Sequence, residues 1–120
     1  MKVIIADDSK VMRNIIQNAM RPMGTEVIQA GSGHEVLQQL EIHDGKIEAI
    51  FMDWNMPGMT GLDCLKILKK NEKYKDIPVL MISTESEDDK MNIAKKAGAK
   101  GYLTKPFTNE ELIKFINSSI

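Results

Sequence analysis

Short apolar runs alternate with longer amphipathic segments along the chain, and this alternation limits the possible folds more than any other feature. Each run has about the length of a β-strand and is apolar at consecutive positions, which is typical of strands buried on both faces of a parallel sheet. The runs are KVIIA (2–6), EVIQA (26–30), EAIFM (48–52), PVLMI (78–82) and GYLT (101–104).

The segments between the runs repeat apolar residues with the period of a helix. One stripe contains Val11, Met12, Ile15, Ile16, Ala19 and Met20, a second Leu62, Leu65 and Leu68, and a third Leu112, Ile113 and Ile116. A Ser or Thr followed three residues later by an acid is a helix-start signal. Such pairs are Ser32 with Glu35, Ser86 with Asp89, and Thr108 with Glu111. Pro22 and Gly24 end the first helix, and Gly98 ends the fourth.

The pattern predicts five strands alternating with five helices, a (βα)5 chain. Strand–helix–strand crossovers are right-handed, and such a chain forms a doubly wound α/β fold with helices on both faces of a parallel sheet. The expected strand order is 2-1-3-4-5, as in flavodoxin-like folds. At 120 residues, the chain is expected to form a single domain over 1–120, with no separate output domain.

Composition excludes several classes of function. Lys and Arg number 16 against 17 Asp and Glu, so nothing indicates a nucleic-acid surface or a polybasic membrane anchor. There is no apolar stretch of membrane-spanning length and no signal-peptide pattern, so we expect a cytoplasmic protein that does not bind membranes. The single cysteine, Cys64, lies at helical spacing with leucines and is interpreted as a small buried side chain.

Polar side chains follow four of the five apolar runs. In open α/β sheets, ligands bind beyond the carboxyl ends of the strands, near the point where the strand order reverses. Each residue alone has an ordinary explanation as a helix cap or a solvated side chain, but the fold brings the loops to one edge. The residues are Asp7-Asp8, Asp53, Ser83-Thr84 and Lys105-Pro106.

These residue types together favour phosphoryl chemistry. Three neighbouring carboxylates need a counter-charge, and all-oxygen ligation favours Mg²⁺. A carboxylate beside Mg²⁺ can be a nucleophile toward phosphorus, and Asp53, on the central strand, is the best candidate. The transferred group spreads charge over three oxygens, which Mg²⁺, Lys105 and the Ser83 hydroxyl are suited to bind.

Four motifs resemble, in order and spacing, the receiver domain of two-component response regulators. They are DD (7–8), MDWNMPGMTG (52–61), MISTE (81–85) and GYLTKPFT (101–108). The resemblance spans essentially the whole chain and is strongest toward the single-domain chemotaxis regulators of that family. It implies a phosphorylation-activated signalling switch that catalyses only its own phosphorylation and dephosphorylation, and is not an enzyme with a separate substrate.

The resemblance also implies a role for each residue of the motifs. Asp53 is the phospho-acceptor; Asp8, Asp53 and the backbone carbonyl of Asn55 bind Mg²⁺, with Asp7 helping through water. Lys105 contacts the phosphoryl group and precedes a cis peptide bond to Pro106. Ser83 is the switch hydroxyl, and Tyr102 is the aromatic residue whose rotamer follows it. Asn55 and Glu85 influence phosphate lifetime, which we expect to be short.

The implied partners are proteins. We expect a chemotaxis-type sensor histidine kinase, an output target such as the flagellar motor switch protein, a possible auxiliary phosphatase, and a monomeric state. Phosphorylation would alter the surface formed by the fourth helix, fifth strand and fifth helix. Met56 and Met59, in the loop after Asp53, are expected to flank the site and to be available to a kinase or phosphatase.

Three residues depart from the chemotaxis pattern on that output surface. Glu87 and Asp88 stand where the pattern has lysines, and Phe115 replaces another lysine. Acids in a first helical turn also simply favour the helix dipole, which accounts for Asp88 and Asp89 without any partner. Both interpretations stay open, and the departure affects only the choice of output target.

Three other functions are weaker fits. A flavin-binding module would need a phosphate loop after the first strand, where this chain has two acids. An aspartate-nucleophile phosphatase would need an acid two residues after the nucleophile, where this chain has Asn55. A degenerate receiver acting as a phosphorylation-independent scaffold is the main alternative, although every acid, the hydroxyl and the lysine are present.

Overall fold

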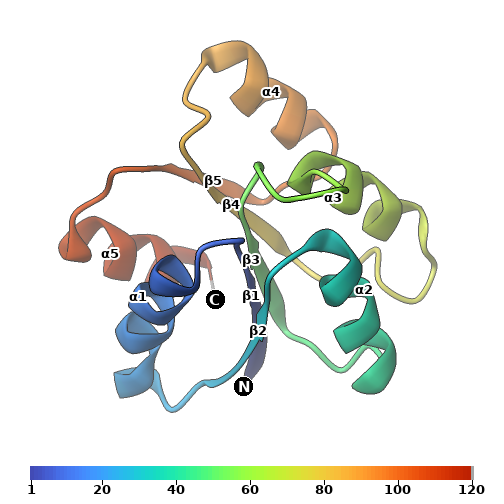
Figure 1. The fold of residues 1–120 in the computed structure, drawn as a ribbon, viewed down its shortest axis with the longest axis horizontal. Coiled ribbons are helices and arrows are strands. Elements are labelled where there is room, and N and C mark those ends of the chain that lie inside the picture. The colour runs from blue at the N-terminus through green and yellow to red at the C-terminus, as the bar shows by residue number, and fades with distance from the viewer. Residues whose placement is uncertain (120) are drawn as a thin grey trace.

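The computed structural model describes residues 1–119 and has a five-stranded parallel sheet in the order β2-β1-β3-β4-β5 (Figure 1). This confirms the fold predicted from the alternating pattern. The elements are β1 Lys2–Ala6, α1 Lys10–Met20, a short 3-10 helix Arg21–Met23, β2 Glu26–Ala30, α2 Gly33–Ile42, β3 Ala49–Met52, α3 Gly61–Lys70, β4 Val79–Ser83, α4 Asp88–Lys96, β5 Gly101–Thr104 and α5 Asn109–Ser119.

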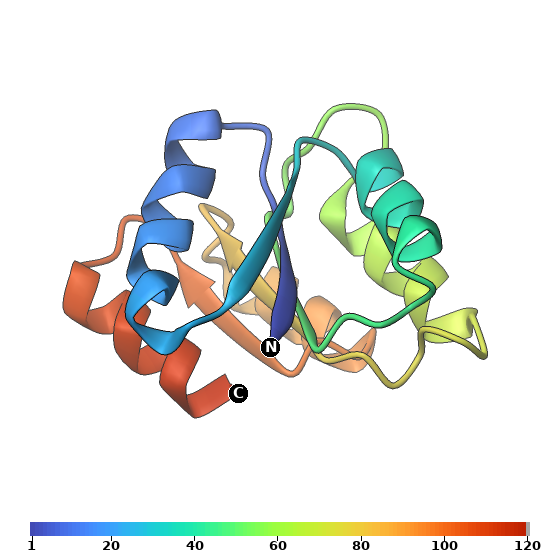
Figure 2. The same ribbon diagram turned by 90° about the horizontal axis from the view of Figure 1, so that it is seen from below.

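The helices form two layers around the sheet. Helices α1 and α5 cover one face, and α2, α3 and α4 cover the other (Figures 1 and 2). Successive side chains of a strand point to opposite faces of the sheet. Ile4 therefore packs on the face covered by α2, α3 and α4, whereas Val3 and Ile5 pack on the face covered by α1 and α5. Full burial of one large apolar side chain such as Ile or Val stabilises the fold by about 1.5–3 kcal/mol. Burial on both faces explains why the central strands β1, β3 and β4 are continuous apolar runs, whereas the edge strands β2 and β5 are mostly half-buried.

Two of the three predicted helix caps are present. The Ser32 hydroxyl accepts the amide of Glu35 at the start of α2. At α5 the capping is reciprocal, since the Thr108 hydroxyl accepts the Glu111 amide and the Glu111 carboxylate accepts the Thr108 amide. The third prediction is wrong: α4 begins at Asp88, its N-cap is Glu87, and no side chain caps it. Acids in its first turn favour the helix dipole instead.

The apolar stripe of α1 is wider than its buried face. Ile16 and Met20 are buried, whereas Val11 is 71% exposed and Ile15 is 42% exposed. Consecutive positions on a helix are 100° apart, so a stripe this wide cannot be covered entirely by one packing partner. Val11 and Ile15 belong to the apolar stripe but lie on the solvent-exposed side of α1.

Phe115 is half-buried and Met56 is buried, so neither side chain is fully exposed. The Phe115 ring packs edge-on to Phe51 with 6.5 Å between centroids, so this difference from the chemotaxis pattern has a packing role. Met56 is only 7% exposed and belongs to the core on the opposite face of the sheet, so the expectation that it is available to a partner is wrong. Within residues 1–119, none of the helices is long and apolar enough to span a membrane.

Candidate functional site

The acidic cluster is positioned by the pairing of β1 with β3. Ala6 is in register with Met52, so the residues that follow each strand emerge side by side. The amide of Asp53 donates to the Ala6 carbonyl at 2.9 Å, and the amide of Asp7 donates to the Ala30 carbonyl at 3.1 Å. The sheet therefore fixes the backbone of both acids before any side-chain contact is made.

Asp7, Asp8 and Asp53 bring their carboxylates together at this edge. One oxygen from each lies within 4.8 Å of the others. Asp7 is 2% exposed and Asp53 is 5% exposed, whereas Asp8 faces solvent. The sequence prediction that these three acids converge is confirmed.

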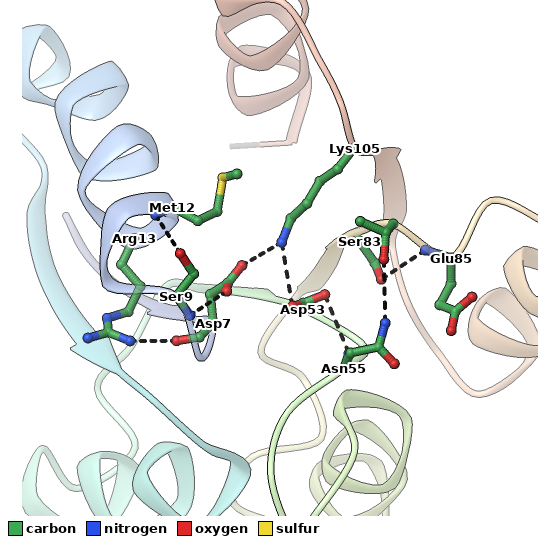
Figure 3. Close-up of polar contacts among 10 residues, drawn as sticks. Asp7, Ser9, Met12, Arg13, Asp53, Asn55, Ser83, Glu85 and Lys105 are labelled. Carbon is green, nitrogen blue, oxygen red and sulfur yellow. Dashed lines mark hydrogen bonds and ion pairs between the residues drawn. The ribbon is translucent and has the colours of Figure 1, made fainter.

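Lys105 supplies positive charge from the loop after β5. Its Nζ lies 2.7 Å from Asp7 Oδ2 and 3.5 Å from Asp53 Oδ2 (Figure 3). The peptide bond to Pro106 is cis, as expected from the resemblance. One ammonium thus faces three carboxylates, which leaves the cluster with excess negative charge.

Burial raises the pKa of the Asp53 carboxyl above its usual value. The Lys105 charge opposes this shift by lowering the pKa, while the nearby Asp7 carboxylate adds to it. Desolvation outweighs the effect of the Lys105 charge, so the net shift disfavours the ionised carboxylate. A second cation beside Asp53 would oppose this shift and favour the ionised form.

The donor set fits Mg²⁺. All of the converging ligand atoms are carboxylate oxygens, the excess charge is negative, and Asp8 is open to solvent, as required for an ion that keeps several waters. The single cysteine is not available as a softer ligand, because Cys64 is buried in the core and burial raises the pKa of its thiol to about 12.

Ser83 and Asn55 lie beside Asp53. Ser83 is the last residue of β4 and is fully buried, and its Oγ accepts the amide of Glu85 at 3.2 Å. The Asn55 amide donates to Asp53 Oδ1 at 3.4 Å, and the Asn55 side chain donates to the Thr84 hydroxyl at 3.5 Å (Figure 3). The loops after β3 and β4 are therefore joined next to the acid.

Tyr102, in β5, is half-buried and reaches the loop after β4. Its hydroxyl donates to the backbone carbonyl of Glu85 at 2.5 Å. Burial is the main reason why the pKa of the Tyr102 phenol is raised above its usual value. Glu85 thus receives one hydrogen bond from Tyr102 and gives another to Ser83.

Two contributors were missed by sequence reasoning. The Arg13 guanidinium donates to the Asp7 carbonyl at 2.6 Å (Figure 3). It also donates to Gln29 Oε1 at 2.9 Å, which ties α1 and β2 to the acidic loop. Gly61 lies so close to the Asp53 backbone that an added Cβ would be 2.0 Å from the Asp53 carbonyl oxygen. Arg13 resembles any solvated helix cation in the sequence, but the glycine in the MDWNMPGMTG stretch was a signal.

Comparisons with known proteins agree with this geometry. The chemotaxis protein CheY of Pseudomonas aeruginosa is 42% identical over 113 residues, covering 93% of this chain and 90% of the relative. CheY-3 of Vibrio cholerae is 41% identical over 90% of this chain and 82% of its own length. The solved structure of the chemotaxis protein CheY4 of Vibrio cholerae superposes with a TM-score of 0.88 at 34% identity, covering 99% of this chain and 98% of that one.

The match extends to the family as a whole. Residues 3–117 fit the response regulator receiver domain, a span that includes all five strands' carboxyl ends and the acidic cluster. The fold, the cluster and the relatives all agree, and the chain belongs to the family of response regulator receiver domains.

Proposed function

We propose that this receiver domain is a signalling switch of a chemotaxis pathway, activated by phosphorylation of Asp53. The observation that supports it most directly is the convergence of Asp7, Asp8 and Asp53 with Lys105 at one sheet edge. Its similarity to CheY proteins from several bacteria supports the assignment to chemotaxis.

In the proposed reaction, a carboxylate oxygen of Asp53 attacks the phosphorus of a phosphohistidine on a sensor kinase. The new O–P bond forms as the N–P bond to the histidine breaks, and the histidine leaves with the electron pair of that bond. Water later attacks the aspartyl phosphate and releases inorganic phosphate, restoring the carboxylate. The chain catalyses these steps on itself and has no separate substrate.

Bound Mg²⁺ would supply a Lewis acid that neutralises charge on the phosphoryl oxygens. The residues assigned to hold it are Asp8, Asp53 and the backbone carbonyl of Asn55, with Asp7 acting through water. Lys105 already lies within 3.5 Å of the Asp53 carboxylate, so its ammonium is near the place where a phosphoryl oxygen would develop charge.

Ser83 and Tyr102 are proposed to transmit the change. The Ser83 hydroxyl is buried beside Asp53, and a phosphoryl group adds charge and acceptor oxygens toward which it can turn. That rotation would disturb its hydrogen bond from the Glu85 amide and hence the Tyr102 bond to the same residue. The surface of α4, β5 and α5 would change as a result and control a protein target such as the flagellar motor switch.

Asn55 and Glu85 are assigned to phosphate lifetime, because they follow the acceptor and the switch hydroxyl by two residues and flank the site. The half-exposed side chain of Glu85 and the exposed one of Asn55 are accessible to water and to an auxiliary phosphatase. A short-lived phosphate is proposed, since chemotaxis must reset quickly.

The test follows the fluorescence of Trp54, the only tryptophan and the neighbour of Asp53, during addition of Mg²⁺ and then acetyl phosphate. The proposal expects each addition to change the signal, and Asp53→Asn to lose the response to acetyl phosphate. Mass spectrometry should find one phosphate on Asp53 of the unmutated chain. If Mg²⁺ has no effect and no phosphate appears, the scaffold alternative replaces the switch.

A further inference from the structure

Lys90 connects α4 to both loops that border Asp53. Its Nζ lies 3.0 Å from Glu85 Oε1, in the loop after β4. The same Nζ lies over the ring of Trp54, in the loop after β3, at 5.8 Å from the ring centroid. A lysine in the first turns of a helix would normally be interpreted as a solvated cation, but this ammonium has two specific neighbours at the site.

All three polar groups of Glu85 have partners. Its amide donates to Ser83 Oγ, its carbonyl accepts the Tyr102 hydroxyl, and its carboxylate pairs with Lys90. The carboxylate points away from Asp53 (Figure 3). The backbone contacts fix the position of the residue, so the Lys90 ion pair is what determines where its negative charge lies.

The second contact of Lys90, with the Trp54 ring, links the lysine to the residue next to Asp53. It directly follows Asp53, is half-buried, and packs against the core on the α2–α4 face of the sheet. A cation over an indole face is attracted by the ring and has a preferred position there. The Trp54 ring therefore holds the Lys90 ammonium next to the site, and Lys90 in turn holds the Glu85 carboxylate.

We propose that Lys90 is a positioning residue for the phosphorylation of Asp53: it neutralises the Glu85 carboxylate and holds it away from the path of the incoming phosphodonor. This proposal rests on the function proposed above. The donor is an anion, and it approaches a cluster in which three carboxylates face one Lys105 ammonium. Without Lys90, the Glu85 carboxylate adds an uncompensated and mobile negative charge at the edge of that cluster.

The experiment measures the phosphorylation rate with acetyl phosphate at saturating Mg²⁺. The Lys90→Met variant should react about two- to five-fold more slowly, the size expected for a partly exposed ion pair. Lys90→Arg should restore the rate, since arginine keeps both the charge and the cation–π contact. Lys95→Met, an exposed lysine in the last turn of the same helix, is the matched control for net charge and should have little effect.

A double-mutant cycle with Glu85→Gln tests the role assigned to Glu85. In the Glu85→Gln background, Lys90→Met should cause no further loss of rate, because the carboxylate that Lys90 holds is gone. Without Mg²⁺ or phosphodonor, Lys90→Met should also shift the emission of Trp54, whereas Lys90→Arg and Lys95→Met should not.

Several outcomes overturn the proposal. Equal rate losses for Lys90→Met and Lys95→Met would mean that only net charge matters. A full effect of Lys90→Met in the Glu85→Gln background would assign the effect to Lys90 alone. Unchanged Trp54 emission in Lys90→Met would show that the contact does not exist. If the unmutated chain takes up no phosphate, both proposals fail, whereas normal uptake with no Lys90 effect refutes only this one.

Discussion

Replacing Asp53 with Asn is expected to stabilise the metal-free protein by about 1–2 kcal/mol, because it removes a buried charge from an acidic cluster. With an effective dielectric constant of about 20, Coulomb's law gives at least about 3.5 kcal/mol of repulsion between two carboxylates whose oxygens lie within 4.8 Å of each other. The attraction of Lys105 for Asp53 at 3.5 Å is about 4.7 kcal/mol on the same basis.

Two further effects decide the balance. Asp8 adds repulsion, weakened by its exposure to solvent, and desolvation of Asp53 penalises its charge. Lys105 also keeps a partner after the substitution, because it lies closer to Asp7, at 2.7 Å. For a domain of 120 residues, the expected gain corresponds to a rise in Tm of about 4–8 °C in EDTA.

The pH dependence of this difference has a definite sign. Burial raises the pKa of Asp53 above the value of the unfolded chain, so the ionised carboxylate lowers the stability of the fold at pH above the raised pKa. That penalty shrinks as the pH falls through the raised pKa and is gone well below 3.8, the pKa of the unfolded chain, where the group is protonated in both states. The Tm difference between the variant and the unmutated chain should therefore shrink over that range.

Thermal unfolding in EDTA over pH 4–8 checks both the stabilisation by Asp53→Asn and its decrease toward low pH. Addition of Mg²⁺ at about 100 times its Kd should then stabilise the unmutated chain by about 2.7 kcal/mol and the variant by less. A variant that is less stable in EDTA at neutral pH, or a difference that does not change with pH, would refute the electrostatic reasoning.

Three other substitutions and one chemical reaction test the structure. Gly61→Ala should lower the free energy of unfolding in urea by about 2 kcal/mol or more, because the added Cβ would lie 2.0 Å from the Asp53 carbonyl oxygen. An unchanged midpoint of the urea transition would contradict this close packing of Gly61 on the Asp53 backbone. Thr108→Ala should cost about 1 kcal/mol in the same assay through loss of the α5 cap, and Ser86→Ala should cost much less, since no side chain caps α4. Cys64 should react with a thiol reagent only after unfolding, because it is buried and its pKa is about 12; fast reaction of the folded protein would argue against this burial.

The local sequence determined the fold and which acidic residues converge at the site. The period of the apolar residues distinguishes strand from helix, and right-handed crossovers leave few ways to arrange five such units. The carboxyl ends of parallel strands then meet at one edge, so residues that directly follow the strands, such as Asp7 and Asp53, converge whatever the details of packing.

Only the tertiary structure decided which side chains pair and which surfaces are covered. The pairing of Lys105 with Asp7, 98 residues apart, depends on the relative positions of β1 and β5. Lys90 over Trp54 and Phe115 against Phe51 likewise depend on how helices lie on the sheet. Sequence periodicity specifies the face on which a residue lies, but the contact itself depends on the rotation and position of the neighbouring element, which all the packed side chains determine together.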